Sequence, residues 1–385
     1  MTNVKALRQP LSLRLSSSIF LTFWCVVAAF PIFWITVMSV KLPIDAFNGN
    51  PLKVIFGPTT LAQGKGLSIL DITIGLTILI ITAKLATGWL IRMVGKFSPS
   101  GYLWAGWIIG SLTFGLLFVL VFFGLQPSLL NILNDISGIL GINIIGFSTE
   151  HYSTVWFEKG FFNNFQNSLL VTTGVVTISL TFGTLAGYAL SRSSSNLAFW
   201  ILIIALIFRA LPHSVLVTGY LPFFMNSAEI LRPLLGDAAP TLYGLPWATI
   251  AVLVAINQPF TIWMLRSFFQ NIPAELDEAA QVDGCSHFQA FRRVIMPVMW
   301  PGVITTGLFS FLLAYNDFLV TSLLLDVQNQ TMVPAIARMF NMETTTTDQV
   351  VAVAAAVSIV APLFFLVLFF QRQIVSGLTA GAVKG

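Results

Sequence analysis

The residues that could carry chemistry fall into two groups. The first is the segment AELDEAAQVDGCSHFQAFRRVIMP (274–297), the densest cluster of charge in a chain that is only 9% charged. The second group is a set of polar residues inside apolar stretches: Arg209, His213, Asn257, Gln258, Asn316 and Asp317. A charge at bilayer depth costs several kcal/mol unless it is paired or hydrated. We therefore expect the second group to face the interior of a helix bundle or a water-filled path.

For this second group, two roles remain open. Arg209, Asn257, Asn316 and Asp317 could line a path for a solute and offer hydrogen bonds to its hydroxyl groups. Alternatively, a structural pair such as Arg209 with Asp317 could close the bundle, and a structural role is favoured for His213. A proton relay typical of an ion-coupled carrier would need more intramembrane acids than the sequence contains.

No pattern of catalytic or metal-binding residues is found in the sequence. Cys25 lies in an apolar stretch and Cys285 in the charged segment, so we expect no disulfide between them, and the three histidines are scattered. The phosphate-binding pattern G-x-x-x-x-G-K-[ST] does not occur. We therefore expect no catalytic residue, no metal site and no cofactor bound by this chain. The net charge of +4 does not indicate nucleic acid, because the distribution of basic residues matters more in a membrane protein.

The elements that must position these residues are membrane spans. The composition is 56% hydrophobic, and apolar stretches of roughly 20 residues, the length that crosses a bilayer, recur along the chain. They lie near 17–38, 70–92, 102–124, 166–191, 197–221, 245–268, 300–325 and 351–371. The first is too long for a signal-peptide core, so it is read as a retained span after a cytoplasmic N-terminus (1–16). The predicted fold class is an all-α polytopic membrane protein with about eight transmembrane helices.

The basic residues predict the orientation of these spans. With the N-terminus in the cytoplasm, the inner segments hold Lys5, Arg8, Arg14, Lys84, Arg92, Lys96, Arg192, Arg266, Arg292, Arg293, Arg372 and Lys384. The outer segments hold only Lys41, Lys53, Lys65, Lys159, Arg232 and Arg338. Because cytoplasmic loops are enriched in Lys and Arg, both termini are expected in the cytoplasm, including the C-terminal tail 372–385.

Small residues at helical spacing predict close helix contacts. The pairs are Gly106 with Gly110 and Gly183 with Gly187, and a second stripe is formed by Thr173, Thr177 and Thr181. Packing inside the bundle is the simpler interpretation, and a subunit interface is the alternative. The aromatic stretch 151–168 is expected to form an interfacial helix that leads into the next span.

Local chemistry predicts two helices and a corner in the charged segment. Pro273 suits a first helical position, and Gly284 suits a left-handed cap at the end of the first helix. Ser286 and Gln289 match a capping box for the second helix, which Pro297 should end. The apolar face of the second helix should hold Phe288, Phe291 and Ile295. A solvated connector does not need two capped helices with apolar faces, so docking of a cytoplasmic partner is the favoured interpretation.

This segment resembles the signature loop of permease subunits in binding-protein-dependent type I ABC importers. Glu278-Ala279-Ala280 is followed by Gly284 and then by Val294-Ile295-Met296-Pro297, where the family pattern has EAA, Gly and I-x-L-P. The resemblance implies that the loop, 271–298, is a coupling element seated in a cleft of the ATPase subunit. Glu278, Ala279, Ala280, Gly284 and Pro297 are then the coupling residues.

Other segments resemble the maltose-transporter branch of that family, specifically the shorter of its two permeases. They are 165–192, 245–280, FLLAYNDFL (311–319) and the tail QRQIVSGLTAGAVKG (371–385). The resemblance implies a core importer domain over 150–371 and a six-span pattern. Residues 66–130 depart from that pattern as an inserted region of two further spans.

By this resemblance, the chain is a multi-pass subunit of the bacterial inner membrane that forms half of a pathway for a sugar, polyol or related solute. Its implied partners are a second homologous permease, two ATPase subunits that bind ATP and Mg²⁺, a periplasmic or lipid-anchored solute-binding protein and the lipid bilayer. The alternatives are a permease with the same loop for a non-sugar solute, and an ion-coupled secondary carrier.

Overall fold

The computed structural model describes residues 11–75, 77, 142–193, 195–209, 213–342 and 346–380. The protein is mostly helical and divides into two compact units, which are 1–151 with 345–354, and 152–344 with 355–385. Most of the predicted insertion at 66–130, with its two spans and the pair Gly106 and Gly110, lies outside the described residues. Each unit is described by itself.

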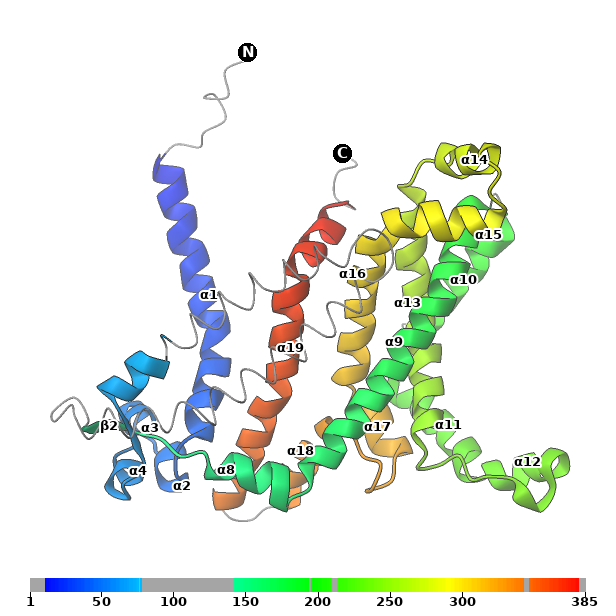
Figure 1. Cartoon of the computed structure of the whole chain (residues 1–385). Helices are drawn as coiled ribbons and strands as arrows, with labels where there is room; N and C mark the ends of the chain where they lie inside the picture. Colours follow the sequence, from blue (N-terminus) through cyan, green and yellow to red (C-terminus); the bar gives the residue numbers. More distant parts are fainter. Residues whose placement is uncertain are drawn as a thin grey trace. The chain divides into compact units, whose positions relative to one another are not determined.

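The first unit joins a long helix to several short elements (Figure 1). Its elements are α1 (Leu11–Ser39), α2 (Pro43–Ala46), α3 (Pro51–Phe56), α4 (Pro58–Ala62), and the antiparallel strands β1 (Gly66–Ser68) and β2 (Asn143–Gly146). Each short helix begins with a proline, which suits this position because the first helical N–H needs no partner within the helix. Gly57 separates α3 from α4 in the left-handed conformation, with φ of 60°.

A buried lysine joins the end of α1 to strand β2. The Lys41 ammonium group donates a hydrogen bond to the carbonyl oxygen of Gly146. Burial lowers the pKa of Lys41 to about 8, although the nearby Asp45 acts in the opposite direction. Burial by itself would raise the pKa of Asp45, but hydrogen bonds from the Thr60 N–H and hydroxyl, at 2.6 and 2.7 Å, bring it below its ordinary value. The His151 Nε2 lies 2.9 Å from the Lys41 carbonyl oxygen, and burial lowers the pKa of His151.

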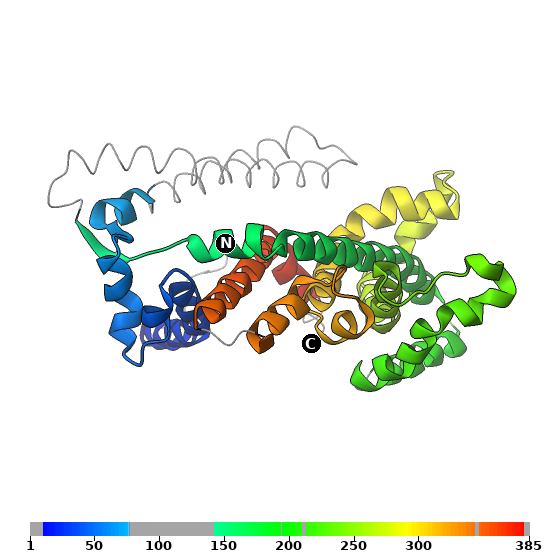
Figure 2. The same cartoon turned by 90° about the horizontal axis from the view of Figure 1, so that it is seen from below.

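The second unit is built almost entirely of helices, with α8 and α19 crossing its boundaries. In chain order the elements are α8 (Glu150–Ser153), η4 (Thr154–Glu158), α9 (Phe161–Arg192), α10 (Asn196–Arg209), α11 (His213–Met225), α12 (Ser227–Leu235), η5 (Gly236–Ala238), α13 (Pro246–Gln270), α14 (Glu275–Val282), α15 (His287–Ala290), η6 (Phe291–Ile295), α16 (Met296–Tyr315), α17 (Leu319–Leu324), α18 (Met332–Met342) and α19 (Thr346–Ala380). Figures 1 and 2 show α9, α13 and α16 lying alongside one another, with α14 and α15 at one end and α12 at the other.

Within the described part of the chain, four helical segments are long and apolar enough to cross a membrane: Leu15–Ser39, Phe161–Arg192, Pro246–Gln270 and His287–Tyr315. The predicted stretches 17–38, 166–191 and 351–371 each lie inside one helix, and 245–268 does so apart from its first residue, the N-cap of α13. The prediction of one continuous helix over 300–325 was wrong, because α16 ends at Tyr315 and α17 begins at Leu319. The stretch 197–221 contains nearly all of α10 and most of α11, and residues 210–212 between these two helices lie outside the described residues.

The interfacial helix predicted over 151–168 is also interrupted. The chain turns at Gly160, whose φ is 67°, between the π-helical turn η4 and the start of α9. Only glycine adopts this backbone conformation without a steric cost, so the two segments form separate helices. The Trp156 indole N–H donates a hydrogen bond of 3.1 Å to the Ser358 hydroxyl of α19.

The central contact of the second unit is the close approach of α9 to α13. A Cβ atom added at Gly183 would lie 2.6 Å from Cγ2 of Thr261, and one at Gly187 would lie 3.0 Å from the backbone N of Arg266. The predicted role of this glycine pair in helix packing is therefore confirmed. The threonine stripe behaves differently, because Thr173, Thr177 and Thr181 are exposed in this single chain.

Candidate functional site

The charged segment forms two helices around a glycine corner, as predicted. Gly284 follows α14 with a φ of 86°, the left-handed conformation that favours glycine. Ser286 and Gln289 then form the predicted capping box. The Ser286 hydroxyl accepts the Gln289 N–H at 3.3 Å, and the Gln289 side-chain oxygen accepts the Ser286 N–H at 3.0 Å. These caps fix both sides of the corner and hold α14 beside α15.

Two proline predictions were wrong. Pro273 is not the first helical residue, because α14 begins at Glu275 with Ala274 as its N-cap. Pro297 does not end the second helix, because the chain continues from α15 through the π-helical turn η6 into α16, and Pro297 lies in the first turn of α16. A proline lacks the backbone donor and its ring crowds the carbonyl four residues earlier. Here that carbonyl belongs to Arg293 in the wider π turn, so the helical path continues.

The outer surface of this loop mixes acidic residues with exposed apolar side chains. Glu278 and Ala279 are exposed, whereas Ala280 is buried. Val282 is 87% exposed, Phe288 64% and Leu276 38%. Phe288 lies beside Phe291 as predicted, with ring centroids 6.4 Å apart, but Phe288 is exposed whereas Phe291 and Ile295 are buried. We call the exposed set Leu276, Glu278, Ala279, Val282 and Phe288 the loop surface.

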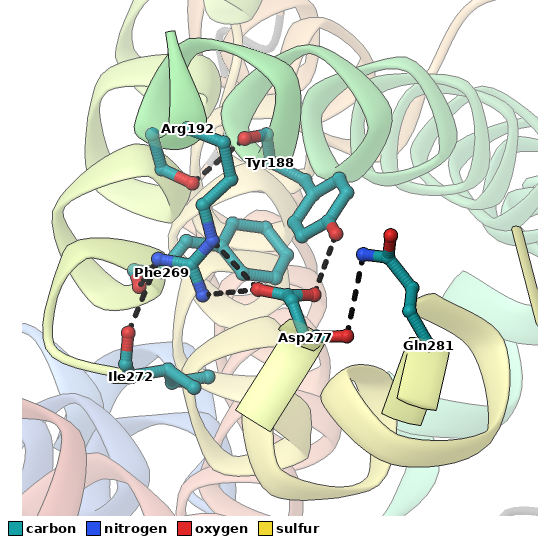
Figure 3. Close-up of polar contacts among 7 residues, drawn as sticks. Tyr188, Arg192, Phe269, Ile272, Asp277 and Gln281 are labelled. Carbon is teal, nitrogen blue, oxygen red and sulfur yellow. Dashed lines mark hydrogen bonds and ion pairs between the residues drawn. The ribbon is translucent and has the colours of Figure 1, made fainter. Parts of the chain in front are cut away.

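Beneath the loop surface, Asp277 fastens α14 to the end of α9 (Figure 3). Oδ1 of Asp277 accepts a hydrogen bond of 2.6 Å from the Tyr188 hydroxyl. Oδ2 accepts one of 2.8 Å from Nε of Arg192, and Nη2 of Arg192 makes an ion-pair contact of 2.8 Å with the same oxygen. Nη1 of Arg192 donates to the carbonyl oxygens of Ile272 at 3.1 Å and Phe269 at 3.4 Å. One guanidinium group therefore links α9, the C-terminal end of α13 and α14.

Aromatic packing supports the same joint from the apolar side. The Tyr188 ring lies 5.5 Å from the Phe269 ring and 4.8 Å from the Phe291 ring, measured between centroids. The cluster around these rings contains the buried residues Leu265, Phe269, Ile272, Phe291, Ile295, Met299 and Val303. Because α13, η6 and α16 all contribute to the cluster, the second half of the loop is packed against the span that follows it.

The polar residues within the spans make neutral contacts. The buried Asn257 on α13 donates through Nδ2 to the Ser310 hydroxyl of α16 at 2.8 Å. The hydroxyl groups of Thr261 and Ser310 lie 3.4 Å apart, and Nε2 of Gln258 donates to the Ser179 carbonyl of α9 at 3.4 Å. These bonds connect α13 to both neighbouring helices. Within the described residues, Oδ1 of Asn257 and Oε1 of Gln258 are buried without a hydrogen-bond partner.

The other predicted pathway residues are Arg209 on α10, and Asn316 and Asp317 between α16 and α17. The Arg209 guanidinium lies over the Phe260 ring of α13, 4.4 Å from its centroid. Asn316 caps the end of α16, and Oδ1 of Asp317 accepts the Thr321 N–H at 2.9 Å at the start of α17. These capping roles explain why the predicted span breaks at this point. The side chain of His213 lies outside the described residues. In the described ranges, no group of three or more His, Cys, Asp or Glu residues is placed to hold a metal ion.

The sequence reasoning missed the partnership of Tyr188, Arg192 and Asp277. Asp277 could be read only as one acid in a helical first turn that is favourable for the helix dipole. Arg192 precedes it by 85 positions, so nothing local indicates the pair. The available signal was that Arg192 ends a long apolar helix and that Asp277 is one of several acids in the nearest charged segment.

Several known proteins are similar to this chain. The diacetylchitobiose uptake system permease protein DasC of Streptomyces coelicolor is 34% identical over 238 residues, which cover 61% of this chain and 80% of that protein. The trehalose transport system permease protein SugB of Mycobacterium tuberculosis is 34% identical over 242 residues, covering 60% and 84%. The maltodextrin transport system permease protein MdxG of Bacillus subtilis is 30% identical over 238 residues, covering 61% and 80%.

The fold is also found among solved structures. A chain from the crystal structure of a bacterial ABC transporter involved in alginate import matches with a TM-score of 0.57 and 16% identity, covering 95% of this chain and 98% of that one. At this identity the match establishes the fold alone. The sequence model of binding-protein-dependent transport system inner membrane components matches residues 179–379. The chain therefore belongs to this family, and it is a multi-pass inner-membrane transport subunit with no catalytic activity and no cofactor of its own.

Proposed function

We propose that this chain forms half of the translocation pathway of an ATP-driven importer for a sugar, polyol or related solute, and that the loop 271–298 couples it to an ATPase subunit. One observation carries the coupling proposal. The two helices of the loop expose Glu278, Val282 and Phe288, while Asp277 on the inner side binds α14 to α9. Exposed apolar side chains gathered on a charged cytoplasmic loop suit burial against a protein partner.

The proposed assembly has a second homologous permease, two ATPase subunits and a periplasmic or lipid-anchored solute-binding protein. The ATPase subunits bind and hydrolyse ATP. In this proposal ATP closes the pair of ATPase subunits, and that closure would push the loop and rock the attached helices. In this arrangement the chain has about eight spans with both termini in the cytoplasm. A first span lies at 17–38, an inserted region at 66–130, a core domain at 150–371 and a tail at 372–385.

Replacements on the loop test the coupling. Glu278→Ala removes the exposed acid of the Glu-Ala-Ala motif, and Gly284→Val forces a β-branched residue into the left-handed conformation. Either change should reduce copurification of the ATPase subunits and abolish ATP-driven uptake in the assembled complex. In this proposal Gly284 and Pro297 determine the shape of the loop, and the small side chains of Ala279 and Ala280 allow close packing of α14 against its neighbours. Glu229→Ala on the exposed turn of α12, at the other end of the unit, is the control. Normal assembly and uptake in both loop variants would contradict docking.

The solute class is proposed from the relatives. The names of the matched permeases refer to diacetylchitobiose, trehalose and maltodextrin, all of which are carbohydrates. A thermal-shift screen of the partner binding protein against sugars, polyols, amino acids and peptides tests this choice. A shift with a carbohydrate is the expected outcome, whereas a shift with an amino acid or peptide alone would assign the loop to a permease for a non-sugar solute. Uptake that persists without ATP in the presence of an ion gradient would favour a carrier.

For the pathway itself, we infer that Asn257 contacts the passing solute or its water. Its buried Oδ1 and the nearby Oε1 of Gln258 are acceptors to which a sugar hydroxyl or water can donate a hydrogen bond. Arg209, Asn316 and Asp317 are proposed to flank the same path. Replacement of Asn257 by Asp, which keeps the shape, should change the Michaelis constant for uptake while ATPase copurification stays normal.

A further inference from the structure

We propose that Arg192 and Asp277 form a rigid joint through which displacement of the coupling loop reaches α9, so that α14 and the end of α9 move as one body. This proposal rests on the proposed coupling function of the loop. It makes Arg192 and Asp277 positioning residues, which need not touch either the ATPase or the solute.

The first argument is the number of partners that this one carboxylate and this one guanidinium group engage on three elements. Both oxygens of Asp277 have partners on α9, with Tyr188 on one and Arg192 on the other. The third nitrogen of the guanidinium group, Nη1, binds the carbonyls that close α13 at Phe269 and Ile272. A planar guanidinium with several donors fixes direction as well as distance, because the fork cannot rotate without breaking bonds to two other elements.

The second argument is shielding. The side chains of Arg192 and Asp277 are 23% and 10% exposed. In contrast, Arg232 and Asp237 at the other end of the unit form a pair of similar length, 2.7 Å against 2.8 Å, with side chains 69% and 88% exposed. A shielded pair is screened little by water and salt, and removal of one member leaves the other charge without compensation. The first pair can therefore resist displacement, whereas the second contributes little.

The third argument is the scarcity of other anchors on α14. Only Asp277 and Ala280 are buried in this helix, and its remaining described side chains are exposed. The aromatic cluster around Phe291 holds η6 and α16 rather than α14. If the charged joint were absent, α14 could follow a moving partner while α9 stayed behind. With the joint in place, the same push is delivered to the long helix that packs along α13.

The experiment measures whether the two elements move together. Glu275 on α14 and Phe182 on α9 are both exposed and lie outside the loop surface, so each can be replaced by a spin-labelled cysteine after Cys25 and Cys285 are changed to serine. The full transporter complex is studied by pulsed EPR, without nucleotide and with Mg·ATP plus vanadate. In the parent chain we expect one narrow 182–275 distance distribution, unchanged between the two conditions.

Asp277→Asn and Arg192→Gln should each broaden that distribution and make its mean shift when Mg·ATP and vanadate are added. The double variant should be no worse than either single one, because both remove the same contact. Arg232→Gln, which breaks the exposed pair, is the matched control and should behave as the parent. A narrow, unchanging distribution in both single variants would overturn the proposal, and so would a nucleotide-dependent distance in the parent.

Arg192→Lys covers the case in which the neutral variants do not assemble. This variant keeps the positive charge but loses the planar guanidinium group with its several donors, so the distance distribution should broaden less than in the glutamine variant. A parent-like distribution with lysine would overturn the claim that the fork is required. Copurification of the ATPase is measured separately on the parent. If it fails there, the proposed coupling function is wrong, whereas broadening in the variants without nucleotide would still support the joint.

Discussion

Helix α9 is held in its middle and at its end by different kinds of contact. In the middle, Gly183 lets Thr261 of α13 approach closely, and the Ser179 carbonyl accepts a neutral hydrogen bond from Gln258. At the end of α9, Arg192 and Tyr188 donate hydrogen bonds to the carboxylate of Asp277. The same helix therefore meets its neighbours through packing at one level and through charge at another.

The difference follows from the surroundings expected of each level. In the middle of an apolar span a charge is costly, and lipid gives no hydrophobic force that drives helices together. Close packing at small residues and neutral hydrogen bonds are what remain. At the end of the span, water can solvate an unpaired charge before assembly, so an ion pair with fixed direction can be used. Packing then keeps α9 and α13 together, and in our proposal the ion pair makes α9 move with α14.

The largest effect is expected from filling the close contact in the middle. In Gly183→Ala the new Cβ would lie 2.6 Å from Cγ2 of Thr261 and 3.2 Å from Cδ1 of Leu265, so α9 and α13 must separate. Overpacking of this kind costs about 1–3 kcal/mol. The melting temperature of the purified complex should fall. Gly219→Ala is the matched control, because its Cβ would meet nothing within 4 Å, and an equal fall in both variants would refute the packing explanation.

A slightly smaller effect is expected from breaking the neutral network. Ser310→Ala removes the partner of the buried Asn257 amide, and an unsatisfied buried donor costs roughly 1–3 kcal/mol. The double variant Asn257→Leu with Ser310→Ala should be less unstable than the sum of the two single variants. A thermal-melting double-mutant cycle measures this coupling. Because no charge is involved, the coupling should not change with salt, and a strong salt dependence would count against a neutral contact.

At the loop corner, the effect should be moderate and local. Gly284→Ala keeps open space around the new Cβ, so its cost is the left-handed backbone alone, about 1–2 kcal/mol. Gly284→Asn should cost less, because asparagine adopts this conformation more readily. Hydrogen exchange should become faster at 284–290 and stay unchanged in α13. Faster exchange throughout α9 and α13 would show that the corner and the packed middle are not separate.

The smallest effect is expected from the capping box. Ser286→Ala removes the acceptor of the Gln289 N–H, and loss of such a cap costs about 1 kcal/mol. Hydrogen exchange at the first turn of α15 should become faster while the melting temperature of the complex stays nearly the same. Equal protection in the variant and the parent chain would mean that packing of Phe291, and not the cap, holds this turn.

How far the sequence predicts these regions depends on how local the determining chemistry is. Gly284 and the pair Ser286 with Gln289 act within a few residues, so their roles could be predicted and are confirmed. Apolar length likewise predicted the positions of α9 and α13. Pro297 was misread because its effect depends on the shape of the preceding turn, which is π-helical here.

The joint at Asp277 could not be predicted, because its partners lie on another helix far along the chain. The break between α16 and α17 was missed for a related reason. Apolar residues on both sides hide the polar pair Asn316 and Asp317 within one apolar stretch, although α16 ends at this pair and Asp317 accepts a hydrogen bond from the start of α17. Patterns of hydrophobicity indicate whether a segment is a membrane span or a loop. Contacts between different helices depend on the tertiary fold, which these patterns do not contain.

Docking of the loop surface on an ATPase subunit is tested most directly by a photo-cross-linker at Val282. Its side chain is 87% exposed, and Leu234 on α12, 83% exposed at the other end of the unit, provides a matched control position. A benzoyl-phenylalanine placed at each position in turn is irradiated in the intact transporter complex, and the adducts are identified by mass spectrometry. An adduct with the ATPase subunit at position 282 and not at position 234 is expected. Its absence at 282 in a complex that still hydrolyses ATP would contradict coupling through this loop.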